Sequence, residues 1–198
     1  FSLMPKEVPS LRTRFRKINT KIPVPESIAI FEDLVRYESR SMQGQLPVVW
    51  DRAEDFQVFD PYGNIWIDFT STIFVANSGH ANPKVISALQ KSLEQKLLHT
   101  YTFIHKVRAE FQKKLIDITP GQFEKAFLLS AGTEATECAI KLMRMHGQAV
   151  RPAKMAIISF REAMHGRTMG AEMLKGNPKT SEWIGYTDPN IYHLPVPF

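Results

Sequence analysis

Apolar residues follow two periods along this chain, and these periods predict its secondary structure. A helical period, with apolar positions at i, i+3, i+4 and i+7, occurs in residues 133–145. An apolar helix face is also expected in residues 27–40, 83–98 and 106–116, and a further helix is expected to start in residues 168–174. Short strand-like runs occur in residues 48–50, 56–59, 65–69, 126–129 and 155–160. Strands and helices alternate in the second half, which is typical of an α/β fold with a parallel sheet. Residues 1–27 and 176–197 have no clear period, so we expect an extended arm and an irregular segment there.

The most informative stretch is a strand, a tight turn and a helix. The apolar run 126–129 is followed by three small residues, 130–132, and the helical pattern begins after Thr133. Glu134 and Glu137 lie near the start of this helix, where carboxylates favour the positive end of the helix dipole. Such a helix start presents free backbone N–H groups to an anion, most often a phosphate. Taken alone, the pattern also suits an ordinary strand–helix connection that binds no ligand.

A second polar loop follows the next strand. The apolar run 155–160 leads into Met164, His165, Gly166 and Arg167. Ligands of open α/β sheets bind beyond the carboxyl ends of the strands. Two successive strands of the predicted sheet thus end in polar, glycine-containing loops, which favours a binding site at this edge.

Four motifs occur in one order and resemble those of a known family. They are FDPYGNIWIDF at 59–69, NSGHANP at 77–83, SAGTEATECAIKLMR at 130–144 and FREAMHGRTMG at 160–170. Together they resemble the class III (subgroup II, ω-type) aminotransferases, which use pyridoxal 5′-phosphate. The similarity runs from about residue 47 to residue 168. Four motifs at consistent spacing are far more specific than any one of them.

The resemblance implies an α/β architecture, the fold-type I of pyridoxal-phosphate transferases. This fold has an α/β/α large domain, which we expect to be truncated in this chain, and an N-terminal α+β segment of the small domain. Residues 1–80 are then the N-terminal arm and part of the small domain. Residues 81–198 are the first part of the large domain that binds the cofactor.

By the same resemblance, the phosphate of pyridoxal 5′-phosphate is expected on the first of the two loops. The backbone N–H groups of Gly132 and Thr133, and the Thr133 hydroxyl, are its expected donors. Ala131 lies beside them, where the family more often has glycine, serine or threonine. This replacement is expected to remove one side-chain contact to the phosphate.

The second loop is expected to contact the ring of the cofactor. Met164 occupies the position at which the family usually has an aromatic ring stacked on the pyridine. Methionine packs against aromatic faces through its polarisable sulfur, but Tyr or Phe stacks better. His165 and Gly166 match the family pattern, with His165 expected near the cofactor as a packing and hydrogen-bonding residue.

Three residues are candidates for substrate contact. Ile73 matches the family position whose side chain faces the substrate, and Tyr101 suits either a pocket wall or the core. Arg167 matches an arginine that meets a substrate carboxylate in some members, because its planar guanidinium binds carboxylates in bidentate fashion. A salt bridge within the loop is the equal alternative for Arg167.

No residue of this chain matches the family's Schiff-base lysine or the aspartate that pairs with the ring nitrogen. We expect both beyond Phe198, so the catalytic residues stay unknown and this chain alone is expected to be inactive. The implied activity moves an amino group from an amino-acid or ω-amine donor to a 2-oxo acid, in a homodimer or larger assembly. Racemase or aminomutase chemistry, and a non-catalytic binding protein, are the alternatives.

Composition limits the other classes of function. The 198 residues carry a formal net charge of +5, part of it in a basic arm without any nucleic-acid motif, so we expect no nucleic-acid partner. No apolar run reaches the roughly 18 residues of a membrane span. The single cysteine, Cys138, excludes an intrachain disulfide and suits a cytoplasmic location. We therefore expect a cytoplasmic protein without a membrane partner.

Two polar residues in the first half invite catalytic or metal roles. Asp68 is expected to end or cap the hairpin rather than to act as an acid. His80 has no partner at metal-ligand spacing, so we expect a structural histidine bonded to backbone and no metal site.

Overall fold

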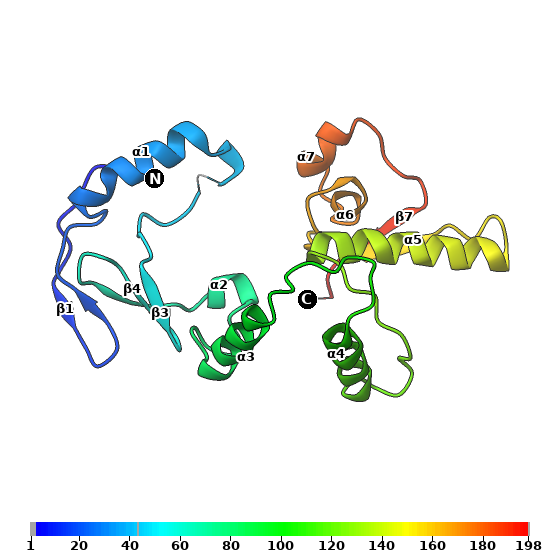
Figure 1. Ribbon diagram of the computed structural model, residues 1–198. Coiled ribbons are helices and arrows are strands. Elements are labelled where there is room, and N and C mark those ends of the chain that lie inside the picture. The colour runs from blue at the N-terminus through cyan, green and yellow to red at the C-terminus, as the bar shows by residue number, and fades with distance from the viewer. Residues whose placement is uncertain (1–2, 43, 198) are drawn as a thin grey trace. The chain divides into compact units, whose positions relative to one another are not determined.

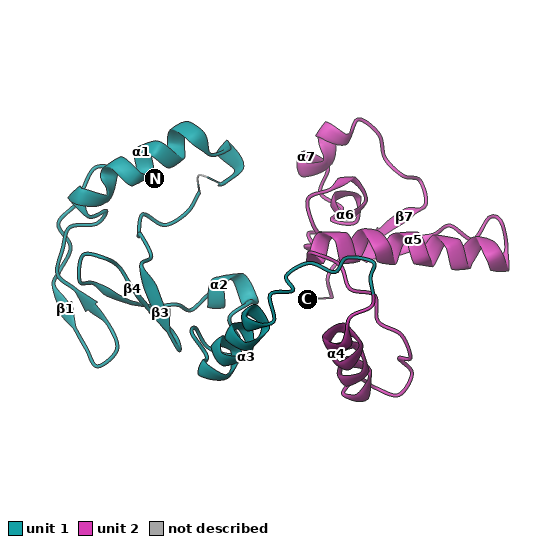
Figure 2. Cartoon of the chain, in the orientation of Figure 1, with its two compact units in different colours: residues 1–103 teal, residues 104–198 magenta. Residues whose placement is uncertain are grey.

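The structure, a computed structural model, describes residues 3–42 and 44–197 (Figure 1). Contacts divide the chain into two compact units, which we call unit 1 (residues 1–103) and unit 2 (residues 104–198) (Figure 2). The boundary expected near residue 80 concerns the domains of the family, and it stays a prediction.

Unit 1 is built on a five-stranded antiparallel sheet with the strand order β1-β2-β5-β4-β3. Its strands are β1 (Leu11–Arg12), β2 (Lys17–Ile18), β3 (Arg52–Glu54), β4 (Gln57–Phe59) and β5 (Ile65–Ile67). The hairpin of β4 and β5 was predicted from the sequence. The N-terminal arm, expected to be extended and without period, in fact contributes β1 and β2 to the same sheet. Strands of two residues carry too few side chains to show a period of two.

Two buried side chains hold the turn between β4 and β5. Asp60 accepts hydrogen bonds from the backbone N–H of Asn64 at 2.8 Å and from Asn64 Nδ2 at 2.7 Å. Asn64 is 1% exposed and also bonds to the arm, because its Oδ1 accepts from the backbone N–H of Asn19 and its Nδ2 donates to Thr20 Oγ1. Each side-chain polar group of this buried asparagine is therefore satisfied within the protein, and the arm is tied to the hairpin.

The helices of unit 1 agree with the predicted ranges, with shorter ends. Helix α1 spans Ile28–Tyr37 and helix α3 spans Pro83–Glu94. Asn82 caps α3 by accepting a hydrogen bond from the Lys84 N–H at 3.0 Å, and Pro83 occupies the first turn as expected. The shorter helical turns are η1 (Pro25–Ser27), η2 (Arg40–Met42) and α2 (Ser71–Phe74).

Unit 2 contains a two-stranded parallel sheet, β6 (Ile157–Phe160) and β7 (Ile191–Leu194). Its helices are α4 (Lys106–Asp117), α5 (Gly132–Val150), α6 (Met169–Met173), α7 (Pro178–Ser181) and the 3-10 turn η3 (Glu182–Ile184). The core joins Ile140 of α5, Ile157 of β6 and Leu174 after α6, with Ile191 of β7 packed against them. Figure 1 shows α6 beside the first turns of α5, with which it is in contact.

Three predictions about the sheets were wrong. Residues 126–129 and 48–50 are not strands, and residues 176–197, expected to be irregular, contain α7, η3 and β7. A strand requires a hydrogen-bonded neighbour, and within the described residues no strand pairs with residues 126–129. Phe127 accordingly remains 72% exposed. Among the described residues, every helix is too short or too polar to span a bilayer.

Candidate phosphate-binding site

The first turn of α5 presents backbone donors to open space. Gly132 is the first residue of the helix, and Ala131 precedes it in extended conformation, with φ of −152°. No side chain caps this helix start, and a Cβ added to Gly132 would meet no atom within 4 Å. The N–H groups of the first turn have no carbonyl partners within the helix. This open helix start, which we call the cradle (residues 131–133), suits an anionic oxygen.

The carboxylate of Glu134 bonds to Ser130, which lies just before the cradle. Its Oε2 accepts a hydrogen bond from the Ser130 backbone N–H at 3.1 Å and a second, short one from the Ser130 hydroxyl. Both bonds lower the pKa of the Glu134 carboxyl below its usual range, and the bond from the Ser130 hydroxyl has the larger effect. The ionised carboxylate therefore fixes the turn that enters the helix.

The second loop lies directly against the cradle. Gly166 has φ of +138°, and a Cβ added to it would lie 2.6 Å from Thr133 Oγ1 and 2.7 Å from Thr133 Cγ2. Only a residue without a side chain permits this approach at this backbone conformation. The structure thus brings Thr133 and Gly166, which are 33 positions apart in the sequence, into one site.

His165 is oriented by a residue that the sequence analysis missed. Its Nε2 lies 3.0 Å from the hydroxyl of Ser159, which is buried in β6. The signal for Ser159 was a lone hydroxyl within an apolar strand, since a buried hydroxyl requires a partner. Met164 and Arg167, on either side of the His165–Gly166 pair, have exposed side chains. Met164 is 68% exposed, so its thioether is accessible to a ligand.

The other two candidates for substrate contact lie in unit 1. Ile73 is 77% exposed and belongs to a turn in which all four residues, Ser71–Phe74, have positive φ between 47° and 70°. Such left-handed backbone is costly for residues with side chains. Tyr101 is 89% exposed. The roles of Ile73, Tyr101 and Arg167 in substrate contact stay predictions.

Asp68 and His80 form a pair that supports this left-handed turn. His80 Nε2 lies 2.8 Å from Asp68 Oδ2, and the carboxylate also accepts from the N–H and hydroxyl of Thr70 and from the N–H of Thr72. Burial raises the pKa of Asp68, but these hydrogen bonds outweigh it and lower the pKa to about 2. The expectation that Asp68 caps the hairpin end is confirmed. The expected backbone partner of the His80 ring was wrong, because its partner is a carboxylate.

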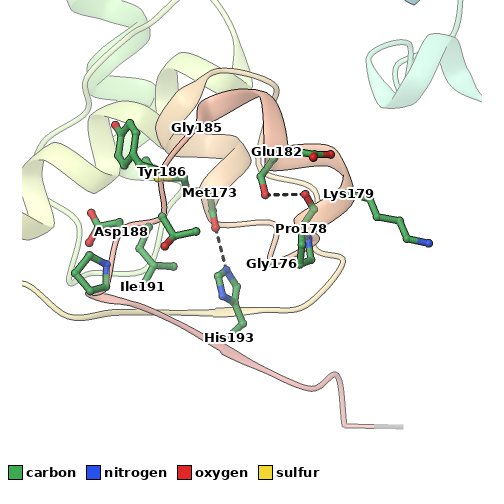
Figure 3. Close-up of a pocket in the computed structure, with 13 residues that line it drawn as sticks. Met173, Gly176, Pro178, Lys179, Glu182, Gly185, Tyr186, Asp188, Ile191 and His193 are labelled. Carbon is green, nitrogen blue, oxygen red and sulfur yellow. Dashed lines mark hydrogen bonds between the residues drawn. The ribbon is translucent and has the colours of Figure 1, made fainter.

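Unit 2 also contains a cavity of about 940 Å³ between α6, α7 and β7 (Figure 3). His193 lies in its wall, with its Nε2 2.9 Å from the Met173 carbonyl oxygen. None of the residues lining it belongs to the cradle or to the second loop, which we call the His165 loop (residues 164–167). The cavity is therefore separate from the site described above. No group of three or more potential metal ligands occurs among the described residues.

An open helix start that lies against a second glycine loop is the geometry of a candidate anion site in an α/β protein. The family model for class-III aminotransferases matches residues 39–198, and the chain belongs to this family. Class-III aminotransferases use pyridoxal 5′-phosphate.

Named relatives agree with this assignment. The chain is 36% identical over 151 residues to the mitochondrial acetylornithine aminotransferase of Candida glabrata, covering 73% of this chain and 35% of the relative. It is 35% identical over 149 residues to the ornithine aminotransferase of Emericella nidulans, covering 74% and 32%. The 5-aminovalerate aminotransferase of Pseudomonas aeruginosa is 39% identical over 130 residues, covering 64% and 29%. The chain spans about a third of the length of these relatives.

Solved structures confirm the fold. An (S)-enantioselective ω-transaminase from Thermomicrobium roseum superimposes with a TM-score of 0.75 at 24% identity, covering 86% of this chain and 40% of its own. A taurine:2-oxoglutarate aminotransferase from Bifidobacterium kashiwanohense, in complex with pyridoxal phosphate and glutamate, gives 0.73 at 22% identity, covering 85% and 38%. The predicted fold-type I architecture is thereby confirmed.

Proposed function

We propose that this chain supplies the phosphate-binding and ring-contacting part of a pyridoxal-phosphate site in an aminotransferase. The observation that carries the proposal is the close approach of Gly166 to Thr133 at an open helix start. This approach joins the two loops that the sequence predicted to bind the two ends of the cofactor.

The cradle fits a phosphate group in charge, donors and space. The N–H groups of Gly132 and Thr133 belong to the uncapped first turn of α5, and the positive end of the helix dipole favours an anion there. The Thr133 hydroxyl adds a donor. The Glu134 carboxylate is bonded to Ser130, so the cradle donors do not require it as their partner.

The His165 loop fits the ring end of the cofactor. Ser159 restricts the imidazole of His165 through the bond to its Nε2, and the exposed Met164 presents a polarisable face. When bound, pyridoxal phosphate supplies the electron sink for amino-group chemistry. The residues of this chain bind and orient it, while the Schiff-base lysine stays a prediction for sequence beyond Phe198.

The substrate class in this proposal is an ω-amino donor that also carries a carboxylate, together with a 2-oxo acid acceptor. The relatives named for acetylornithine, ornithine and 5-aminovalerate support it, since each of these compounds has an amino group far from a carboxylate. Arg167 is the proposed carboxylate contact, and Ile73 and Tyr101 are proposed pocket residues. A homodimer and a cytoplasmic location are further parts of the proposal, although two yeast relatives are mitochondrial.

Cofactor binding is tested by measuring the affinity of the purified protein for pyridoxal 5′-phosphate and for pyridoxal. Thr133→Val keeps the shape of the side chain that packs on Gly166 but removes the hydroxyl. A hydrogen bond to a charged group contributes about 1.5–3 kcal/mol, so we expect roughly tenfold to hundredfold weaker binding of the phosphorylated ligand and little change for pyridoxal. Thr136→Val is the matched control, because it makes the same replacement one turn later in α5, where the hydroxyl donates to the Gly132 carbonyl rather than to the open cradle.

Equal affinity of the wild-type protein for both ligands would contradict the phosphate cradle. Borohydride reduction with bound cofactor, followed by intact mass, tests for a Schiff-base lysine. Conversion of 2-oxoglutarate to glutamate with an ω-amino donor then distinguishes an aminotransferase from racemase or aminomutase chemistry and from a non-catalytic relative.

A further inference from the structure

One face of α5 carries the residues that contact the rest of the site. Thr133, Glu137, Ile140 and Arg144 are spaced by four, three and four positions, so they lie in one stripe along the helix. Thr133 lies against Gly166, Ile140 belongs to the core, and Arg144 Nη2 lies 2.5 Å from Asp188 Oδ2. Glu137 is the one carboxylate of this stripe, and it lies one turn beyond the cradle.

Glu137 bonds to a different helix. Its Oε1 accepts a hydrogen bond from the Ala171 backbone N–H at 3.0 Å and a short one from the Thr168 hydroxyl. Thr168 is the residue that precedes α6, and its side chain does not cap that helix. The role that an N-cap side chain normally has, acceptance from the N–H of the third helical residue, is therefore taken by a carboxylate of α5.

The backbone of α6 fits closely around this carboxylate. A Cβ added to Gly170 would overlap Glu137 Oε2 and would lie 3.1 Å from Ile140 Cδ1. Glycine at position 170 thus allows α6 to approach α5 closely enough for both hydrogen bonds. The sequence placed Glu137 near the start of its own helix, and the structure adds hydrogen bonds from its carboxylate to α6 and to the residue before it.

Hydrogen bonds hold the His165 loop near both of its ends. The His165 loop (residues 164–167) is held at one end by Ser159 on His165 and at the other by Glu137 on Thr168. Loss of the Glu137 bonds would release the end of the loop that carries Arg167 and Gly166. Because Glu137 and Thr133 lie on one rigid helix, the same carboxylate sets the distance between this loop and the cradle.

We propose that Glu137 is a positioning residue, which fixes the His165 loop against the phosphate cradle by capping α6 from α5. The part of this inference that concerns the cofactor rests on the proposed function above. The part that concerns the loop does not, since it follows from contacts within the protein.

The test compares three variants with a control. Glu137→Ala removes both hydrogen bonds, Glu137→Gln keeps a carbonyl oxygen that can accept both, and Thr168→Val removes the hydroxyl bond alone. Glu110→Ala is the control, because Glu110 is an exposed glutamate in α4 whose carboxylate pairs with Lys106 at 3.6 Å. Amide hydrogen exchange of the cofactor-free protein is measured over residues 164–171, and pyridoxal 5′-phosphate affinity is measured by titration.

We expect Glu137→Ala to exchange at least tenfold faster at Ala171 and across the His165 loop, while residues 140–150 of α5 keep their protection. Its affinity for pyridoxal 5′-phosphate should fall roughly tenfold, since the cradle and the His165 loop are no longer held in fixed positions relative to each other. Glu137→Gln should restore most of both properties, and Thr168→Val should lie between them.

Unchanged exchange over residues 164–171 in Glu137→Ala overturns the inference, whatever the cofactor does. Faster exchange with unchanged affinity overturns the part that concerns the cofactor, because the loop would then be free without consequence for binding. If the wild-type protein binds no pyridoxal 5′-phosphate, the proposed function fails, and the exchange data alone decide whether Glu137 positions the loop.

Discussion

Gly166 provides the sharpest test of the geometry of the site. Its φ of +138° disfavours any residue with a side chain, and an added Cβ would lie 2.6 Å from Thr133 Oγ1 and 2.9 Å from Ala171 Cβ. Gly166→Ala therefore introduces two costs at once. One is backbone strain, and the other is overlap with Thr133 and Ala171, which belong to two different helices.

The expected loss of stability follows from these two costs. Positive-φ strain at a residue with a side chain costs about 1–3 kcal/mol, and an extra carbon in a packed contact costs about 1–3 kcal/mol. Their sum, about 2–6 kcal/mol, is a large fraction of the 5–15 kcal/mol that is typical of a folded domain. We expect the variant to be marginally stable.

Urea unfolding measures this loss as a lower midpoint at an unchanged slope. Gly132→Ala is the matched control: it adds the same carbon in the same site, but into open space within α5, so its unfolding free energy should change by about 1 kcal/mol or less. Thr133→Ala removes the Oγ1 and Cγ2 atoms that the new carbon meets. In a double-mutant cycle it should recover the part of the overlap cost that is due to Thr133, but neither the overlap with Ala171 nor the backbone strain.

A loss below about 1 kcal/mol for Gly166→Ala would refute the close approach of the two loops. A large loss without any coupling to Thr133→Ala would locate the cost in the backbone strain and in the overlap with Ala171. The contact between Thr133 and Gly166 would then not hold the site together.

Three further predictions concern other parts of the chain. The folded-state pKa of Asp68, about 2, lies below its ordinary value of 3.8. The ionised carboxylate therefore adds about 2 kcal/mol to the free energy of unfolding above pH 4, and this stability is lost as pH falls toward 2. In urea unfolding from pH 7 to pH 2, the free energy of unfolding should fall less for Asp68→Asn than for the wild type. Asn64→Ala should lower the unfolding free energy by about 2–4 kcal/mol, since it removes the buried side-chain bond to Asp60 and both side-chain bonds to the arm. An effect below 1 kcal/mol in thermal or urea unfolding would contradict the network. Met164→Tyr should strengthen pyridoxal 5′-phosphate binding about twofold to tenfold in titration, because an aromatic ring stacks better on the pyridine by about 0.5–1.5 kcal/mol; weaker binding would place Met164 away from the ring.

The sequence alone determined the longer helices and the residue types of the two loops. The expected ranges of α3, α4 and α5 agree with the structure to within a few residues, except that α3 ends earlier and α5 extends to Val150. Such helices are predictable because their hydrogen bonds, caps and apolar faces lie within a few residues of one another in the chain. The motif around Thr133 and the motif around Gly166 were likewise readable as short local patterns.

Tertiary structure decided which segments pair as strands. Strands β1, β2, β3 and β7 were not predicted, and the apolar run 126–129 is not a strand in the described residues. A strand is defined by a hydrogen-bonded neighbour that can lie anywhere in the sequence, so a run such as 126–129 shows apolar character but not its partner. The pairing of Ile157 with Ile191 joins segments 34 residues apart, and no local pattern encodes it.

The same reason separates the residues of the site that were predicted from those that were not. Ala131, Gly132 and Thr133 stand at a helix start that the sequence shows directly. The bond from Ser159 to His165 and the cap that Glu137 provides to α6 depend on how β6 and α6 pack against α5. The sequence thus determined the groups that can meet a phosphate, and only the packing of α5 against the His165 loop and α6 decided which side chains hold those groups in place.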